Sequence, residues 1–119
     1  MAGEQTVLIP NNPIYAVAEP VPTQEITSAG AITILAGGMV VINAGSGIAV
    51  TLTAPLRNGI KLFVVSKTAQ AHTLDLATSG INGTSNDIGT FGSAIGDGVI
   101  LVSLGDHWYD FANTNVTWA

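Results

Sequence analysis

Two histidines with acidic neighbours come closest in this sequence to a metal-binding or proton-transfer pattern. His72 precedes Asp75 by three positions, and His107 lies between Asp106 and Asp110. On a β-strand, residues three apart point to opposite faces, so neither histidine shares a face with the acid that follows it at this spacing. We therefore expect no metal site and no cofactor. A meeting of histidines from separate copies across a three-fold axis stays an open alternative.

Ser103 and His107 are the pair that most resembles part of a hydrolase site. Such a site needs an activated serine, a histidine and an orienting acid, and many hydrolases hold the serine in a Gly-x-Ser-x-Gly turn. The sequence contains no such turn, and only 9% of its residues are charged, which leaves few groups for an electrostatic site. We expect no catalytic residues and a protein that is not an enzyme.

Two further groups could bind a ligand. Asp87 with Asn82 and Asn86 offers oxygen ligands for calcium, but the acids are few and the EF-hand spacing is absent, so we interpret the segment as a turn-rich loop. Trp108 and Tyr109 could stack on sugars. Because covering the core is the commoner role of aromatic residues on a strand, we assign both rings to the core.

The composition excludes some partners and predicts others. The net charge is −5 and there are three cations, which argues against nucleic-acid binding, and no apolar run approaches the roughly 20 residues of a membrane-spanning helix. Hydrophobic residues make up 47% of the 119 residues, and the mean hydropathy is +0.47. A soluble monomer needs a charged surface. We expect a surface covered by sister copies or another protein, or by Gly, Ser, Thr and Asn, and hence an obligate oligomer.

A β-hairpin within residues 97–111 is the best-defined element. Residues 99–104 form a nearly continuous apolar run, typical of a strand buried on both faces. Gly105-Asp106 then marks a tight turn. The return strand carries Trp108, Tyr109 and Phe111, whose rings can cover the open side of a β core.

Short strands separated by Ala-Gly pairs are expected upstream, at 31–35, 39–43, 48–53, 61–67 and 72–77. Residues 79–98 read as a loop or a set of very short strands, and no segment keeps helical periodicity. We predict an all-β fold, a compact sandwich or barrel of short antiparallel strands that assembles as a trimer. The residues expected in the core or in subunit packing are Val50, Leu52, Phe63, Val65, Leu101, Trp108, Tyr109, Phe111 and Trp118.

The first 25 residues differ from the rest because they hold four of the five prolines together with many apolar residues. Proline disfavours helices and central strands, so we predict an extended arm over residues 1–25 and a β domain over 26–119. The alternative is a first edge strand and a surface loop of the same domain. The arm residues expected to contact a partner surface are Val7, Leu8, Ile9, Ile14, Tyr15 and Val17.

Residues 98–109, Gly-Val-Ile-Leu-Val-Ser-Leu-Gly-Asp-His-Trp-Tyr, resemble a pattern in tailed-phage virion proteins. There, a strand with Val-Ser leads through a glycine-containing turn to a Trp-Tyr pair. The segments 49–55, 59–65, 72–76 and 81–83 are similar to upstream parts of the same small trimeric β modules, which occur in head-decoration (cement) proteins, head fibres and tail fibres or spikes. The resemblance covers residues 48–111.

The resemblance implies a non-enzymatic structural protein that assembles as a homotrimer on the virion. Because the module fills nearly the whole chain, we expect a cement protein, made in the host cytoplasm, that binds the major capsid protein on the outer capsid surface and stabilises the head. The predicted arm would lie on the shell. The alternative is a head- or tail-fibre module that binds a receptor or carbohydrate through residues 79–98 and Trp118.

Overall fold

The computed structural model describes residues 21–119. The six predicted arm residues Val7, Leu8, Ile9, Ile14, Tyr15 and Val17 lie outside the described residues. The elements are β2 (Thr23–Ile26), β3 (Gly30–Ala31), β4 (Gly38–Ile42), β5 (Ala49–Leu52), β6 (Lys61–Ser66), β7 (Thr73–Leu76), the 3₁₀ turn η2 (Ile81–Gly83), β8 (Ile88–Phe91), β9 (Gly98–Leu104), β10 (His107–Thr114) and β11 (Val116–Trp118).

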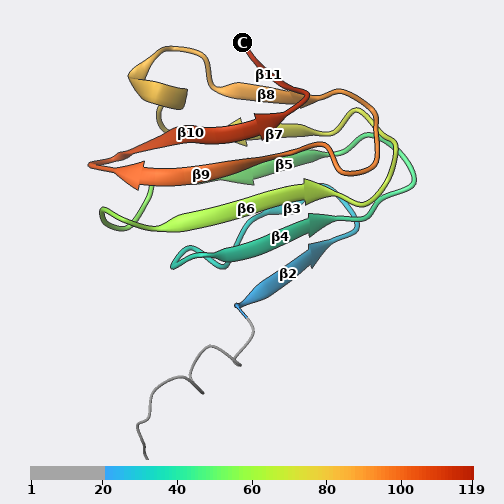
Figure 1. Cartoon of the computed structure of the whole chain (residues 1–119), viewed down its shortest axis with the longest axis horizontal. Coiled ribbons are helices and arrows are strands. Elements are labelled where there is room, and N and C mark those ends of the chain that lie inside the picture. The colour runs from blue at the N-terminus through green and yellow to red at the C-terminus, as the bar shows by residue number, and fades with distance from the viewer. Residues whose placement is uncertain (1–20) are drawn as a thin grey trace, which may run out of the picture.

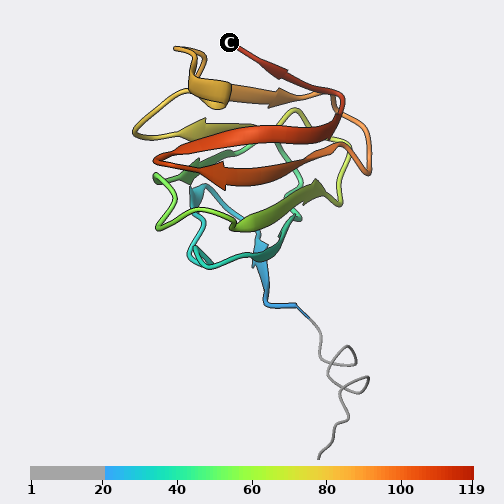
Figure 2. The same ribbon diagram turned by 60° about the vertical axis from the view of Figure 1, so that its left-hand side comes forward.

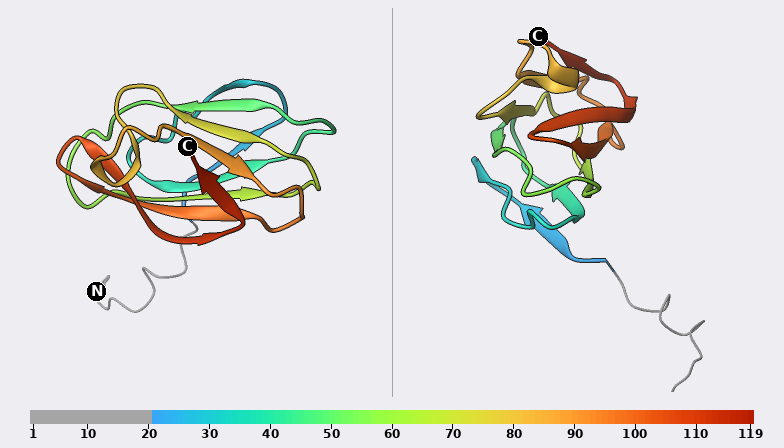
Figure 3. Two further views of the ribbon diagram at one scale, coloured as in Figure 1. Left: turned by 90° about the horizontal axis from the view of Figure 1, so that it is seen from above. Right: turned by 90° about the vertical axis from the view of Figure 1, so that its left-hand side faces the viewer.

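These strands form two five-stranded sheets packed face to face (Figures 1 and 3). The front sheet of Figure 1 has the order β10-β9-β6-β4-β2, and the back sheet has the order β11-β8-β7-β5-β3. The predicted all-β fold is confirmed, as a compact two-layer structure rather than a closed barrel.

The prediction of antiparallel strands throughout is wrong. From β2 to β7 the chain changes sheet after every strand, so neighbours within a sheet are two strands apart along the chain and run in the same direction (Figure 2). The pairs β2–β4, β4–β6, β3–β5 and β5–β7 are therefore parallel. The Ala-Gly pairs lie at or near crossings between sheets rather than in hairpin turns, and Gly37 takes a φ of 114°.

Antiparallel pairing begins with β8, which lies beside β7 and β11, while β9 joins β6 to β10. The predicted hairpin is confirmed: His107 pairs with Leu104, and the turn residues between them are Gly105 and Asp106. Gly105 has a φ of 65°, which glycine adopts readily and which a type II′ turn requires at this position. A β-bulge interrupts β10 between Asp110 and Ala112, leaving Phe111 as the extra residue.

The core lies between the two inner faces. Alternate residues of each strand are buried there, as a period of two requires. β9 departs from its prediction, because every second residue is buried while those between are only half-buried, so this strand is buried on one face and not on both.

Two boundaries also differ. β2 begins at Thr23, so the predicted division between residues 25 and 26 falls inside this edge strand. β3 consists of Gly30 and Ala31 and shares only Ala31 with the strand predicted at 31–35. In the region 79–98 the chain forms η2 and β8. Within residues 21–119, η2 is the sole helical element, and no helix there has the length and apolar character needed to cross a bilayer.

Candidate functional site

The residues that could do chemistry are held apart or bound into the fold. His72 is fully buried on the inner side of the back sheet, whereas Asp75 is half-buried on the outer side, as the strand spacing predicts. The Ile48 N–H donates to His72 Nδ1 at 3.3 Å, and Thr68 Oγ1 lies 3.0 Å from Nε2. The ring is therefore neutral, with its hydrogen on Nε2. Burial lowers the pKa of His72 below its ordinary value of 6.5.

Ser103 and His107 do not form a catalytic pair. Ser103 is buried on the inner face of β9, where its hydroxyl accepts from the Ile60 N–H at 2.8 Å and donates to the Arg57 carbonyl at 2.6 Å. His107 lies at the exposed hairpin tip, with Nδ1 3.6 Å from an Asp106 carboxylate oxygen. Ser103 thus holds the turn before β6 in place, and both of its hydrogen-bonding capacities are used.

No group of three or more His, Asp or Glu side chains within the described part of the chain could hold a metal ion. Asn82, considered above as a calcium ligand, has a φ of 56° in η2 and accepts a hydrogen bond from the Asp110 N–H at 2.9 Å. This contact ties η2 to the outer edge of β10. The side chain supports the fold there.

A buried carboxylate that the sequence analysis did not single out serves the fold in the same way. Asp97 is 1% exposed and accepts hydrogen bonds from the Ala94 N–H at 3.0 Å and from Asn115 Nδ2 at 3.1 Å. Asn115, at a φ of 56°, is the single residue between β10 and β11. Asp97 therefore fixes the loop before β9 to the turn that returns the chain to the back sheet.

The residues predicted for core or subunit packing separate into three environments. Val50, Leu52, Leu101 and Trp108 are buried in the core. Trp118 is half-buried within its own chain, where its ring lies over Gly89 and its Nε1 donates to Asp110 at 3.0 Å. The other four are not core residues: Phe63, Val65 and Tyr109 are half-buried on the outer side of the front sheet, and Phe111 is 75% exposed.

The outer side of the front sheet is apolar over adjacent strands. The register sets Met39, Phe63, Ile100 and Ala112 side by side in one row across β4, β6, β9 and β10. We call the outward apolar residues of the three central strands the apolar face: Met39, Val41, Phe63, Val65, Ile100 and Val102. All six are half-buried in the single chain. Contiguous apolar surface is typical of interaction sites.

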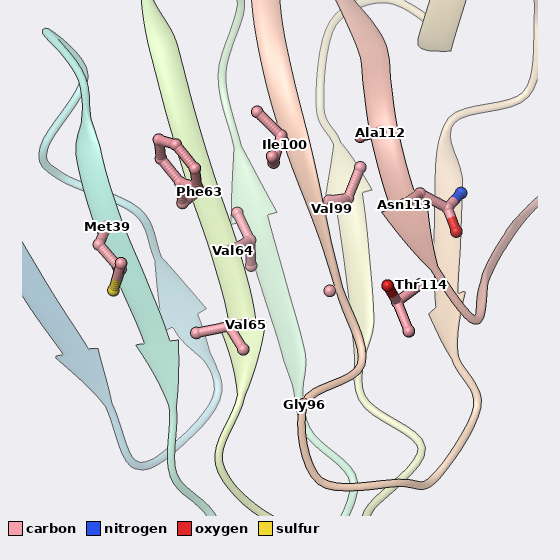
Figure 4. Close-up of a pocket in the computed structure, with 11 residues that line it drawn as sticks. Met39, Phe63, Val64, Val65, Gly96, Val99, Ile100, Ala112, Asn113 and Thr114 are labelled. Atoms are coloured by element: carbon pink, nitrogen blue, oxygen red, sulfur yellow. The ribbon is translucent and has the colours of Figure 1, made fainter.

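A hollow of about 360 Å³ opens on this face (Figure 4). Met39, Phe63, Val65 and Ile100 stand around it, and β10 adds Ala112, Asn113 and Thr114 to its lining. Space is left because the neighbours of Val65 and Ile100 on the adjacent strands are Gly98 and Ala112, which are small. A side chain at Gly98 would collide with the Val64 carbonyl, so the backbone packing itself requires glycine at this position.

The outer side of the back sheet has a different composition. We call its outward residues the threonine face, since four of the seven are threonines: Ala49, Thr51, Thr73, Asp75, Ile88, Thr90 and Thr117. Threonine hydroxyls bind water, so this face can remain exposed. The two outer faces are therefore chemically distinct, and the apolar face is the candidate functional site.

The sequence matches no known protein family, and no curated protein is similar to it.

Proposed function

We propose that the protein is a non-enzymatic structural component of a phage virion, a capsid decoration protein that binds the outer capsid surface as a homotrimer and stabilises the head. One observation carries the part of this proposal that concerns assembly: one of the two outer faces is apolar across three adjacent strands. Covering such a surface removes it from water, which drives association of protein chains. The virion role follows from the resemblance of residues 48–111 to trimeric phage modules.

The residues that could have done chemistry are bound into the fold, which supports a structural role. His72, Ser103, Asn82 and Asp97 each use their polar groups in hydrogen bonds that hold loops or turns of their own chain. None is left as a free buried group facing a ligand. In the proposal these residues stabilise a rigid body, and binding depends on surfaces.

The position of β2 supports a separate role for the segment before it. Val21 is exposed and leads directly into β2, which is the edge strand of the front sheet. In the proposal, residues 1–20 bind the major capsid protein, and the apolar face makes contacts between copies.

The test measures mass and head binding separately. Sedimentation equilibrium of the full chain is expected to give a trimer, and the purified protein is expected to bind expanded phage heads that lack decoration protein. A variant without residues 2–20, which keeps β2 intact, is expected to remain trimeric and to lose head binding. A monomer at all concentrations would contradict the proposal, as would a specific glycan-array signal without head binding, which indicates the fibre alternative.

A further inference from the structure

We propose that Phe111 of one copy inserts into the hollow of the apolar face of the next copy, and that three such contacts close a ring. This inference rests on the proposed homotrimer and assigns its interface. It joins two features that have no partner among residues 21–119: an exposed aromatic ring and an open, largely apolar hollow.

Phe111 is placed to reach another molecule. It is the extra residue of the β-bulge in β10, an edge strand, and it is 75% exposed, the largest value among the exposed large hydrophobic residues of the described chain. Bulges re-aim side chains and are common at sheet edges. The next residue, Ala112, lines the chain's own hollow, yet Phe111 does not fill it.

The hollow suits an aromatic ring in size and chemistry. An apolar cavity of about 150 Å³ is sufficient to hold a benzene molecule, so a phenyl ring fits in 360 Å³ with room for part of its own strand. Met39 and Phe63 on its rim offer the sulfur and aromatic contacts that such a ring favours. Fully buried aromatic residues are also the usual energetic centres of interfaces.

Charge does not oppose the approach of two copies at this face. Lys61 on β6 and Glu25 on β2 are the charged residues that the strand alternation places outward on the described front sheet, and their charges cancel. Asp110 points to the inner side, where it accepts from Trp118. The chain as a whole carries −5, so its excess negative charge lies elsewhere. Two such faces can meet without net repulsion.

The contact joins Phe111 of one copy to the hollow of another, and the proposed homotrimer requires it to be head-to-tail. Phe111 lies at the β10 edge, and Met39 lies on β4, three strands away. In a two-fold dimer the Phe111 of each copy would enter the hollow of the other, whereas a head-to-tail repeat of the contact produces either a closed ring or an open filament. A ring of three uses every hollow and every Phe111 once.

Disulfide trapping tests this contact directly, because the sequence contains no cysteine. Within one chain, β4 and β10 are separated by about 14 Å, three strand spacings of ~4.8 Å, which exceeds the ~7 Å limit between disulfide-linked Cα atoms. A Met39→Cys/Phe111→Cys double variant is therefore expected to form covalent trimers on oxidation. A mixture of the two single variants is expected to form covalent dimers containing one of each.

A second measurement uses substitutions without new bonds. Phe111→Asp is expected to weaken trimer association by about 30-fold or more, the loss typical of an interface centre. Leu56→Asp is the matched control: Leu56 is 62% exposed, lies in the connection before β6, and is expected to leave association unchanged. Circular dichroism of both variants checks that the fold is retained.

The outcomes separate this inference from the proposed function. Suppose that the wild-type chain is a trimer, that the double cysteine variant forms no disulfide between positions 39 and 111, and that Phe111→Asp associates as tightly as Leu56→Asp. That result would overturn the interface and leave the homotrimer standing. A wild-type monomer would overturn both. A covalent filament ladder in place of a trimer would overturn the closed ring.

Discussion

The two sheets have similar inner faces and opposite outer faces. Inside, both present Val, Leu and Ile together with buried polar side chains: Ser66 and Ser103 in the front sheet and His72 beside β7 in the back sheet. Outside, the back sheet presents mainly threonine, and the front sheet presents Met, Val, Phe and Ile. A chain with few charges can thus still build a hydrated surface, and it does so on one side only.

This difference shows that the apolar face is not a by-product of low charge. Threonine and valine are both β-branched and favour strands to a similar degree, so either could occupy an outward strand position without changing the fold. Threonine at the outward positions of β4, β6 and β9 would have given two hydrated faces. The outward positions of these strands hold apolar residues instead, and the proposed contact between copies rests on this difference.

The largest expected effect tests which side of the front sheet is the core. Trp108 is 1% exposed, and its Nε1 donates to the Thr53 carbonyl at 2.8 Å. Trp108→Ala is expected to lower the free energy of unfolding by about 3–5 kcal/mol, because it leaves a cavity and an unpaired carbonyl. Urea denaturation measures the change. Ile95→Ala, at a side chain that is 72% exposed, is the control and is expected to change stability by less than about 0.5 kcal/mol. Equal effects would contradict the placement of Trp108 in the core.

The next effect compares the two outer faces directly. Phe63→Asp places a charge at the centre of the apolar face and is expected to weaken association by about 30-fold or more, since burying an unpaired charge is costly. Thr90→Asp places the same charge on the threonine face and is expected to leave the mass in solution unchanged. Analytical ultracentrifugation over a dilution series measures both. If the two variants associate equally well, the faces do not differ in function.

The smallest expected effect is a pH dependence of stability, which arises from the buried histidine of the back sheet. The folded state holds His72 neutral and lowers its pKa below 6.5, so at lower pH the unfolded chain binds more protons than the folded one. Above pH 6.5, His72 is neutral in both states and the free energy of unfolding keeps its full value. As the pH falls below 6.5, the free energy of unfolding decreases by at most about 1.4 kcal/mol per pH unit.

Urea midpoints measured from neutral pH to about pH 5 test this dependence. In His72→Phe the carboxylates still titrate, so the difference between the two curves isolates the histidine. A difference that does not change with pH would show that protonation of His72 is not linked to unfolding.

Local patterns in the sequence were sufficient for several parts of the fold. The strand predicted at 72–77 contains β7, and Gly105-Asp106 predicted the turn between β9 and β10. The opposite orientation of His72 and Asp75 followed from the strand period of two. These features depend on residues close together in the chain, and so they can be predicted from it.

The pairing of strands could not be predicted in this way. An Ala-Gly pair can mark the end of a strand both where the chain turns back in a hairpin and where it crosses to the other sheet. The parallel pairing of strands was therefore not predicted. The rings of the return strand were expected to cover the core, yet Tyr109 lies on the outward side and the β-bulge exposes Phe111, while Phe63, predicted for core or subunit packing, also lies outward. An apolar residue can face a core or an interface, and its type does not distinguish the two.

The sequence by itself determined the all-β fold, the hairpin and the polarity of individual strands, because strand propensity and alternation act over a few residues. Only the tertiary structure decided which strands became neighbours. That choice gathered Met39, Phe63 and Ile100, far apart in the chain, into one apolar row, and it collected the threonines on the opposite side. The physical reason is that alternation determines which side chains of a strand share a face, but it does not determine which strands pair with it.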